Sequence, residues 1–167
     1  MTTKPMLTAV IVVAAAALFL AYRWKSQQPR TFKSTDDFIQ WSASEAVRDA
    51  DSQDHIQLDY SVDSLKTVDN ILGRVHEAYV KNPVSVSVKG LGSAYGAYVG
   101  EVIRRSEPGS RWERDDAVGG EKSYPLIWRR LHLYPFGWCQ KRILNGDEES
   151  IWTTYAAAKE QASHRIL

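Results

Sequence analysis

Apolar residues along this chain follow three patterns, and each pattern predicts a different kind of element. From Met6 to Tyr22 the chain is almost continuously apolar, with Thr8 as its one polar residue and no charge. Between about residues 34 and 105, apolar residues recur every three or four positions, which is typical of amphipathic helices. From Trp112 onward, short segments alternate apolar and polar residues, as half-buried strands do.

The continuous apolar segment predicts a membrane anchor. Residues 6–22 are 17 residues long, close to the ~20 that an α-helix needs to cross the hydrocarbon core of a bilayer. Trp24 suits the headgroup region and no small-residue cleavage site follows, so an uncleaved anchor is favoured over a signal peptide. Positive charges lie mainly after the segment, which predicts a cytoplasmic domain and leaves a periplasmic one open: Arg23, Lys25, Arg30 and Lys33.

The rest of the chain predicts a single α+β domain. Residues 1–24 form the predicted anchor and residues 25–33 a polar tether, and residues 34–167 form a domain of about four helices and a small antiparallel sheet. The 6 tryptophans and 8 tyrosines indicate that this domain has a packed core.

Capping residues and apolar spacing predict where the helices lie. The first begins at Ser34, runs to about Asp51 and buries Phe38, Trp41 and Ala46. A strand is expected at 56–60, and then a second helix that carries a clear apolar stripe: Leu65, Val68, Leu72, Val75 and Tyr79. Asn82-Pro83 ends it, and a third helix covers about 84–105. A last helix follows a cap at Asp147 and directs these residues to the core: Ile151, Trp152, Tyr155, Ala158 and Ala162.

Three glycines at steps of four mark one face of the third predicted helix: Gly92, Gly96 and Gly100. Glycine lowers helix stability by about 0.5–1 kcal/mol relative to alanine, so the three predict a close approach to the helix backbone. Packing on another helix or on a sheet is the favoured interpretation. A homodimer formed through this face is the alternative.

The alternating segments predict the sheet. Strands are expected near Trp112, at 124–128 and at 131–134, with Arg129-Arg130 at a turn. Pro135-Phe136-Gly137 interrupts the alternation, which resumes and predicts a further strand at 138–143 before a turn at Asn145-Gly146.

Two segments form a distinctive combination. One is Leu91–Arg105 with Arg111-Trp112 soon after it, and the other is Tyr134–Ile143 with Asn145-Gly146 and residues 152–155. Together they resemble a bacterial family of small α+β domains of unknown function, over about Leu58 to Tyr155. The resemblance implies the fold and a bacterial origin and transfers no mechanism. With the anchor, it predicts a single-pass protein of the bacterial inner membrane. Similar domains near secretion and toxin–immunity systems suggest an accessory or immunity-like role.

Glu101 is the one weak candidate for a catalytic residue. It lies on the glycine-rich helix, with Arg104 and Arg105 at the i+3 and i+4 positions that form helix-surface ion pairs. A membrane-anchored enzyme could use Glu101 as an acid or a base with a nearby arginine. A structural carboxylate paired with an arginine is the more common case, so that interpretation is favoured.

Other kinds of chemistry find little support in the sequence. The 4 histidines and the single cysteine show no metal-ligand spacing, and no phosphate-binding glycine loop or serine nucleophile elbow occurs, so neither a metal nor a cofactor is expected. Cys139 is expected to be a buried structural thiol.

Binding to a protein partner is therefore the favoured class of function. The net charge of +1 does not favour nucleic acid. Arginines and aromatic residues are typical of binding hot spots, and the candidates here are Tyr95, Glu101, Arg104, Arg105, Trp112 and Trp138.

Overall fold

The computed structural model describes residues 30–164. The chain divides into two compact units, Met1–Phe32 and Lys33–Leu167, and in the first unit only the irregular residues 30–32 are described. The predicted anchor at residues 6–22 therefore lies outside the described residues. Within residues 30–164, no helix is both long enough and apolar enough to cross a membrane.

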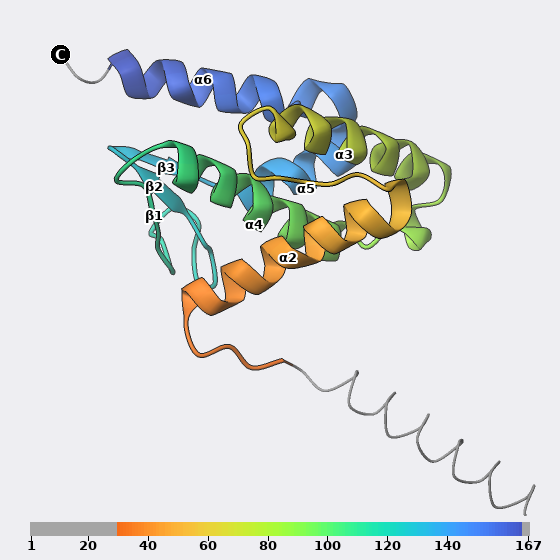
Figure 1. Ribbon diagram of the computed structural model, residues 1–167, viewed down its shortest axis with the longest axis horizontal. Coiled ribbons are helices and arrows are strands. Elements are labelled where there is room, and N and C mark those ends of the chain that lie inside the picture. The colour runs from red at the N-terminus through yellow and green to blue at the C-terminus, as the bar shows by residue number, and fades with distance from the viewer. Residues whose placement is uncertain (1–29, 165–167) are drawn as a thin grey trace, which may run out of the picture. The chain divides into compact units, whose positions relative to one another are not determined.

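The second unit is an α+β domain, as predicted, with five α-helices and a three-stranded antiparallel sheet in its described part (Figure 1). Its helices are α2 (Thr35–Asp54), α3 (Ser64–Lys81), α4 (Val88–Ser106), α5 (Pro135–Asn145) and α6 (Ile151–His164). Its strands are β1 (Arg111–Trp112), β2 (Leu126–Trp128) and β3 (Leu131–Leu133). Two short 3₁₀-helices are η1 (Pro83–Ser85) and η2 (Gly146–Glu149).

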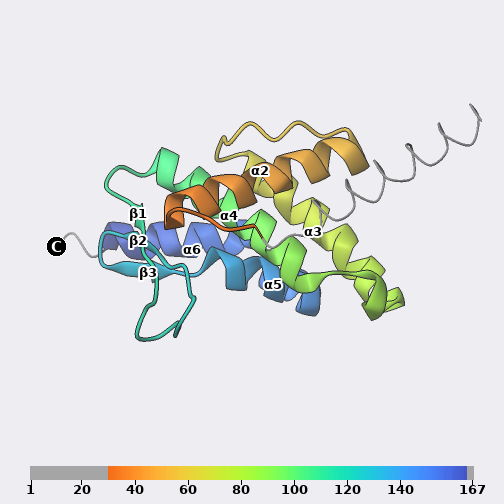
Figure 2. The ribbon, with the colours of Figure 1, turned by 90° about the horizontal axis from the view of Figure 1, so that it is seen from below.

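Helix α4 is the centre of the domain. It lies between α2 and α5 (Figures 1 and 2), and residues 95–103 are all buried, as in a helix covered on every side. Helix α3 packs on α5 and α6. The sheet lies at one end of the helices, where β2 contacts α4 and β3 contacts α6.

The glycine face of α4 is covered by other parts of the same chain. A Cβ atom at Gly96 would lie 2.5 Å from the Cα atom of Phe136, at the start of α5. At Gly92 the nearest atom would be Cγ of Gln140, 2.4 Å away. The predicted close packing of this face is thus present, and it is α5 and β1 that pack there. A homodimer through the three glycines has no free surface to use, because α5 already occupies it.

The start of α2 follows its local signal. The Ser34 Oγ accepts a hydrogen bond from the Asp37 amide, 3.1 Å away, at the start of α2. The buried face of α2 differs from the prediction, because Phe38 and Trp41 are only half-buried. Ala46 is buried, as predicted, and three further residues complete the face that lets α2 approach α4: Ile39, Ala43 and Ala50.

The predicted strand at 138–143 is wrong, because this segment belongs to α5. Proline at the first position starts a helix as well as it interrupts a strand, since its missing N–H would have no helical acceptor there. Cys139, Arg142 and Ile143 are the buried residues of the segment, at the spacing of a helix.

One further predicted strand and two predicted helix starts also differ from the structure. Residues 56–60 contain no strand, and the Tyr60 amide donates to the Tyr98 hydroxyl at 2.8 Å instead of to a neighbouring strand. Helix α4 begins at Val88 rather than near 84, because η1 precedes it and Ser87 caps it. The last helix begins at Ile151 rather than after Asp147, which lies in η2.

The sheet has the strand order β1-β2-β3. Leu126 pairs with Trp112 on one side and with Leu133 on the other. Arg129 and Arg130 form the turn between Trp128 and its partner Leu131, as predicted. Arg129 adopts φ 56° because this tight turn requires a left-handed residue.

Candidate functional site

The candidate site is built around Glu101, near the C-terminal end of α4. Its side chain is 0% exposed, although the carboxylate of glutamate is rarely fully buried without partners. Other segments of the domain surround this part of α4, so all partners of Glu101 come from within the protein.

Four side chains from three segments contact the Glu101 carboxylate. Arg104 binds it with two nitrogens, Nε at 2.7 Å from Oε1 and Nη2 at 2.9 Å from Oε2. The indole Nε1 of Trp112 donates to Oε1 at 2.9 Å, and Nε2 of Gln40 donates to Oε2 at 2.7 Å. The Nε atom of Arg105 lies 3.6 Å from Oε2. We refer to these five residues as the Glu101 cluster.

These donors keep Glu101 ionised. Burial alone would raise the pKa of this carboxyl, but the hydrogen bonds from Arg104, Trp112 and Gln40 outweigh burial and lower it below its usual value. A general acid near neutral pH needs a raised pKa and access to a reacting atom. Glu101 has neither property, so its geometry is that of a positioning residue.

A polar cavity of about 340 Å³ borders the cluster. Three of the four partners of Glu101 line it, together with residues from the start of α2 and from β1: Asp36, Gln40, Arg104, Ser110, Arg111 and Trp112. The Arg104 side chain is 38% exposed, so Glu101 fixes one edge of the guanidinium while the rest reaches the cavity. We call this cavity the arginine pocket.

Gly100 explains how Trp112 reaches Glu101. A Cβ atom at Gly100 would lie 2.1 Å from the six-membered ring of the indole, so only glycine lets the ring lie against α4. The Gly100-Glu101 pair and the distant Arg111-Trp112 pair are parts of the sequence pattern noted above. The fold thus brings these two parts of the pattern into direct contact.

Arg105 is held on a second side. Its guanidinium carbon lies 3.6 Å from the centroid of the Tyr60 ring, a cation–π contact. Its side chain is 42% exposed. Arg105 therefore adds a second positive charge beside Glu101 without lining the arginine pocket.

Two predicted binding residues lie outside the cluster. Tyr95 is fully buried and its hydroxyl donates to the Asp49 carboxylate at 2.7 Å, where burial raises the pKa of the tyrosine. Trp138 is half-buried on α5 and takes part in none of the hydrogen bonds of the cluster. We assign both residues to the packing of the domain.

Cys139 is a buried thiol, as predicted. Burial raises its pKa far above the usual range, so the thiol stays protonated and unreactive. No group of three or more metal-ligating side chains occurs in the part of the chain that the structure describes.

Sequence reasoning did not identify Gln40, because it lies 61 positions from Glu101 and is an ordinary exposed position of α2 by its pattern. It also missed a cluster in the loop between β1 and β2. There the Asp116 carboxylate accepts from the Tyr134 hydroxyl at 3.0 Å and from Nδ1 of His132. The amides of Val118 and Gly119 also donate to it, and together these bonds lower the pKa of Asp116 to about 2.

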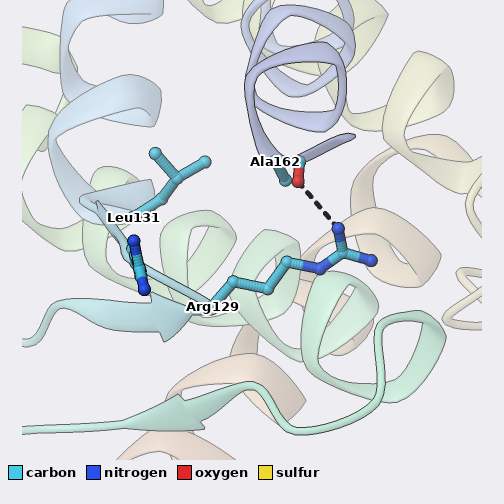
Figure 3. Close-up of a pocket in the computed structure, with 4 residues that line it drawn as sticks. Arg129, Leu131 and Ala162 are labelled. Atoms are coloured by element: carbon cyan, nitrogen blue, oxygen red, sulfur yellow. Dashed lines mark hydrogen bonds between the residues drawn. The ribbon is translucent and has the colours of Figure 1, made fainter. Parts of the chain in front are cut away.

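Another hollow, of about 330 Å³, lies beside Arg129, Arg130, Leu131 and Ala162 (Figure 3). Arg129 points across it and donates to the Ala162 carbonyl at 2.7 Å. Carbonyls in the last turn of a helix lack helical donors, so this arginine satisfies one of them. The contact attaches the β2–β3 turn to α6, which is a structural role.

Comparisons with protein-family models, with curated proteins and with solved structures find no match to this chain. The resemblance to a bacterial family of small α+β domains therefore stays a prediction, and a function can be inferred only from the site itself.

Proposed function

We propose that this protein is a membrane-anchored bacterial interaction module whose arginine pocket accepts an acidic side chain of a protein partner. The observation that carries the proposal is the position of Arg104. A fully buried carboxylate holds one edge of its guanidinium, and the other edge borders a polar cavity. A preorganised arginine loses little side-chain entropy on binding, so it suits recognition of a carboxylate.

The other residues of the pocket fit a single carboxylate. Arg111 adds a second guanidinium, which already donates to Glu113 at 2.6 Å, whereas the Ser110 hydroxyl donates to the Glu107 carbonyl at 2.7 Å. Three carboxylates, Glu101, Asp36 and Glu113, stand against the three guanidinium groups of Arg104, Arg105 and Arg111, so the site has no large excess of positive charge. A multiply charged polyanion such as nucleic acid is therefore a poorer fit than one acidic side chain.

Trp112 supplies the apolar part of the proposed interface. It is half-buried beside the two arginines, and tryptophan with arginine is the composition of binding hot spots. An accessory or immunity-like partner protein would meet the domain here.

Binding of an acidic peptide tests the proposal. The full-length chain in uncharged lipid nanodiscs would be titrated into a fluorescein-labelled peptide with alternating Glu and Gly, and anisotropy would be read. A peptide with Gln in place of Glu serves as the uncharged counterpart. We expect Arg111→Gln to weaken binding of the Glu peptide about fivefold, which corresponds to the loss of one exposed charged contact.

Arg48→Gln is the matched control for this experiment. Arg48 is also exposed, pairs with the nearby Glu45 and lies on α2 outside the arginine pocket. Equal binding by the two peptides, or an equal effect of the two substitutions, would reject the proposed recognition.

The membrane location rests on the apolar segment at residues 6–22 and on the positive charges that follow it. Extraction of native membranes with alkaline carbonate should leave the full-length chain in the pellet, and Leu18→Arg should release it into the soluble fraction. A fluorescent protein fused after Leu167 should be bright if the domain faces the cytoplasm. A reporter active only in the periplasm should be silent at the same position.

A further inference from the structure

A second cavity, of about 460 Å³, lies on the other flank of the start of α2. Its walls come from α2, from α4, from the start of α5 and from the loop between β1 and β2, which projects from the sheet (Figure 2). A cavity of this size suits a small organic ligand. We call it the aromatic pocket.

Aromatic rings form the inner wall of the aromatic pocket. The ring centroids of Phe38 and Tyr124 lie 4.7 Å apart, and those of Tyr124 and Phe136 lie 5.8 Å apart. These three side chains come from three different segments and are each half-buried, so they present ring faces and edges to the cavity. Such a wall favours a flat or acyl apolar group.

Two lysines give the same pocket a positive charge. Lys89 of α4 and Lys122 of the loop line it, and both are exposed. Within residues 30–164 neither lysine has an ion-pair partner, and no Asp or Glu lines this cavity. Two loop carboxylates are already engaged: Asp115 accepts from the Lys122 amide, and Asp116 accepts from four donors. The other polar side chains that line the cavity are uncharged: Ser93, Ser123, Gln140 and the tyrosines Tyr124 and Tyr134, of which Tyr134 donates its hydroxyl to Asp116.

The loop holds Lys122 at the rim at a cost in backbone strain. Lys122 has φ 62° and Asp115 has φ 60°, a conformation that costs about 1–2 kcal/mol for a residue with a side chain. The Lys122 amide donates to the Asp115 carboxylate at 2.6 Å, which fixes the strained turn. Strain that is held by specific hydrogen bonds is a feature of ligand-binding segments.

We infer that the aromatic pocket binds a small amphipathic organic anion. Its apolar ring or acyl group would pack against Phe38, Tyr124 and Phe136, and its carboxylate or phosphate would lie between Lys89 and Lys122. This inference does not depend on the arginine pocket, because the two cavities share none of the residues that line them.

Calorimetric titration with 1-naphthoate tests the inference, with 1-naphthylmethanol as its neutral counterpart. The full-length chain would be used in lipid nanodiscs, and titrations into empty nanodiscs would be subtracted to remove partition into lipid. We expect naphthoate to bind at least about fivefold more tightly than the alcohol, because only the anion can meet the two lysines. A titration with naphthyl phosphate in place of naphthoate compares the affinity of the pocket for a phosphate with its affinity for a carboxylate.

Substitutions at the rim localise the binding. Each of Lys89→Gln and Lys122→Gln should weaken naphthoate binding about threefold and the double variant about tenfold, without change for the alcohol. Lys141→Gln is the control, because Lys141 is an exposed lysine of α5 that does not line the cavity. Absence of naphthoate binding, equal affinity for the alcohol, or equal effects of the rim and control substitutions would overturn the inference.

Discussion

Two buried charges of opposite sign organise different parts of this domain, and their partners point in different directions. Glu101 of α4 is surrounded by Arg104, Arg105, Trp112 and Gln40, three of which continue to the arginine pocket. Arg142 of α5 has a side chain only 7% exposed and binds Asp69 of α3 at 2.8 Å and Asp147 at 2.8 Å.

The partners of Arg142 serve the packing of helices. Asp69 also accepts from the Ile151 amide at 3.1 Å and from the Ser150 hydroxyl at 2.6 Å, so it caps α6. Arg142 and Asp69 thus connect α3, α5 and the start of α6. Burial of a charge therefore does not by itself indicate a functional site. A buried charge is a candidate for function when its partners line a cavity, as those of Glu101 do, and is structural when they only connect helices, as those of Arg142 do.

Loss of the Arg142 charge should have the largest effect on stability. Arg142→Met keeps much of the side-chain volume but leaves Asp69 without its guanidinium, and we expect a loss of about 3 kcal/mol in the free energy of unfolding. Urea denaturation measures it, and Lys141→Met at the exposed neighbouring position should change little. Acidic-peptide binding by the folded fraction should be unchanged. Unaltered stability would show that Arg142 contributes packing alone.

Glu101→Gln should show whether Glu101 affects peptide binding by holding Arg104 in position or through its own negative charge. Gln cannot satisfy Arg104, Trp112 and Gln40 together, so we expect a loss of about 2 kcal/mol in the free energy of unfolding. Removal of a negative charge should strengthen binding of an acidic peptide if charge alone matters. If Glu101 acts by holding Arg104, binding should weaken, and fluorescence anisotropy distinguishes the two signs.

Gly100→Ala should displace Trp112 and leave the Arg142 region intact. The new methyl group would overlap the indole, while helix propensity would offset part of the cost, so we expect a net loss of about 1 kcal/mol. The emission maximum of tryptophan should shift and acidic-peptide binding should fall. Gly137→Ala is the matched control, because a Cβ atom at this helical position of α5 would meet only the Cβ atom of Tyr134, 3.9 Å away. Equal effects of the two substitutions would contradict the proposed role of Gly100.

Acid should lower the free energy of unfolding through both Glu101 and Asp69. The effect should be small near neutral pH and grow as the pH falls. Burial raises the pKa of Asp69, but hydrogen bonds from Ser150, Arg142 and Ile151 lower it overall, and Glu101 is also lowered. A carboxyl whose pKa is lower in the folded state stabilises the fold fully above its unfolded pKa. That stability is lost as the pH falls below the ordinary values of 3.8 for Asp and 4.5 for Glu.

Urea denaturation from pH 6 to pH 2.5 measures this dependence. We expect the free energy of unfolding to fall below about pH 5, with a shallower fall in Glu101→Gln and in Asp69→Asn. Asp37→Asn is the control, since Asp37 is exposed in the first turn of α2. Equal slopes for all of these proteins would contradict the assignment of the two buried centres.

The candidate site could be predicted in part. The spacing of Glu101, Arg104 and Arg105 on one helix follows from the sequence, and so does the need for a close neighbour at Gly100. The identity of that neighbour does not follow from the sequence, because Trp112 comes after a loop and its side chain could have faced either side of a short strand. Gln40 carries no local signal, and the aromatic pocket is assembled from four separate segments.

Local sequence signals were sufficient to predict the α+β class, the capped start of α2, the stripe of α3, the turn at Arg129-Arg130 and the glycine face of α4. These features depend on interactions within a few residues, which spacing and capping report. Three features became evident only from the folded domain: residues 138–143 are helical, residues 56–60 pair with no strand, and Glu101 accepts from both Trp112 and Gln40. Those outcomes depend on contacts between distant segments, because a short apolar pattern fits a helix or a strand equally until its packing surface is present.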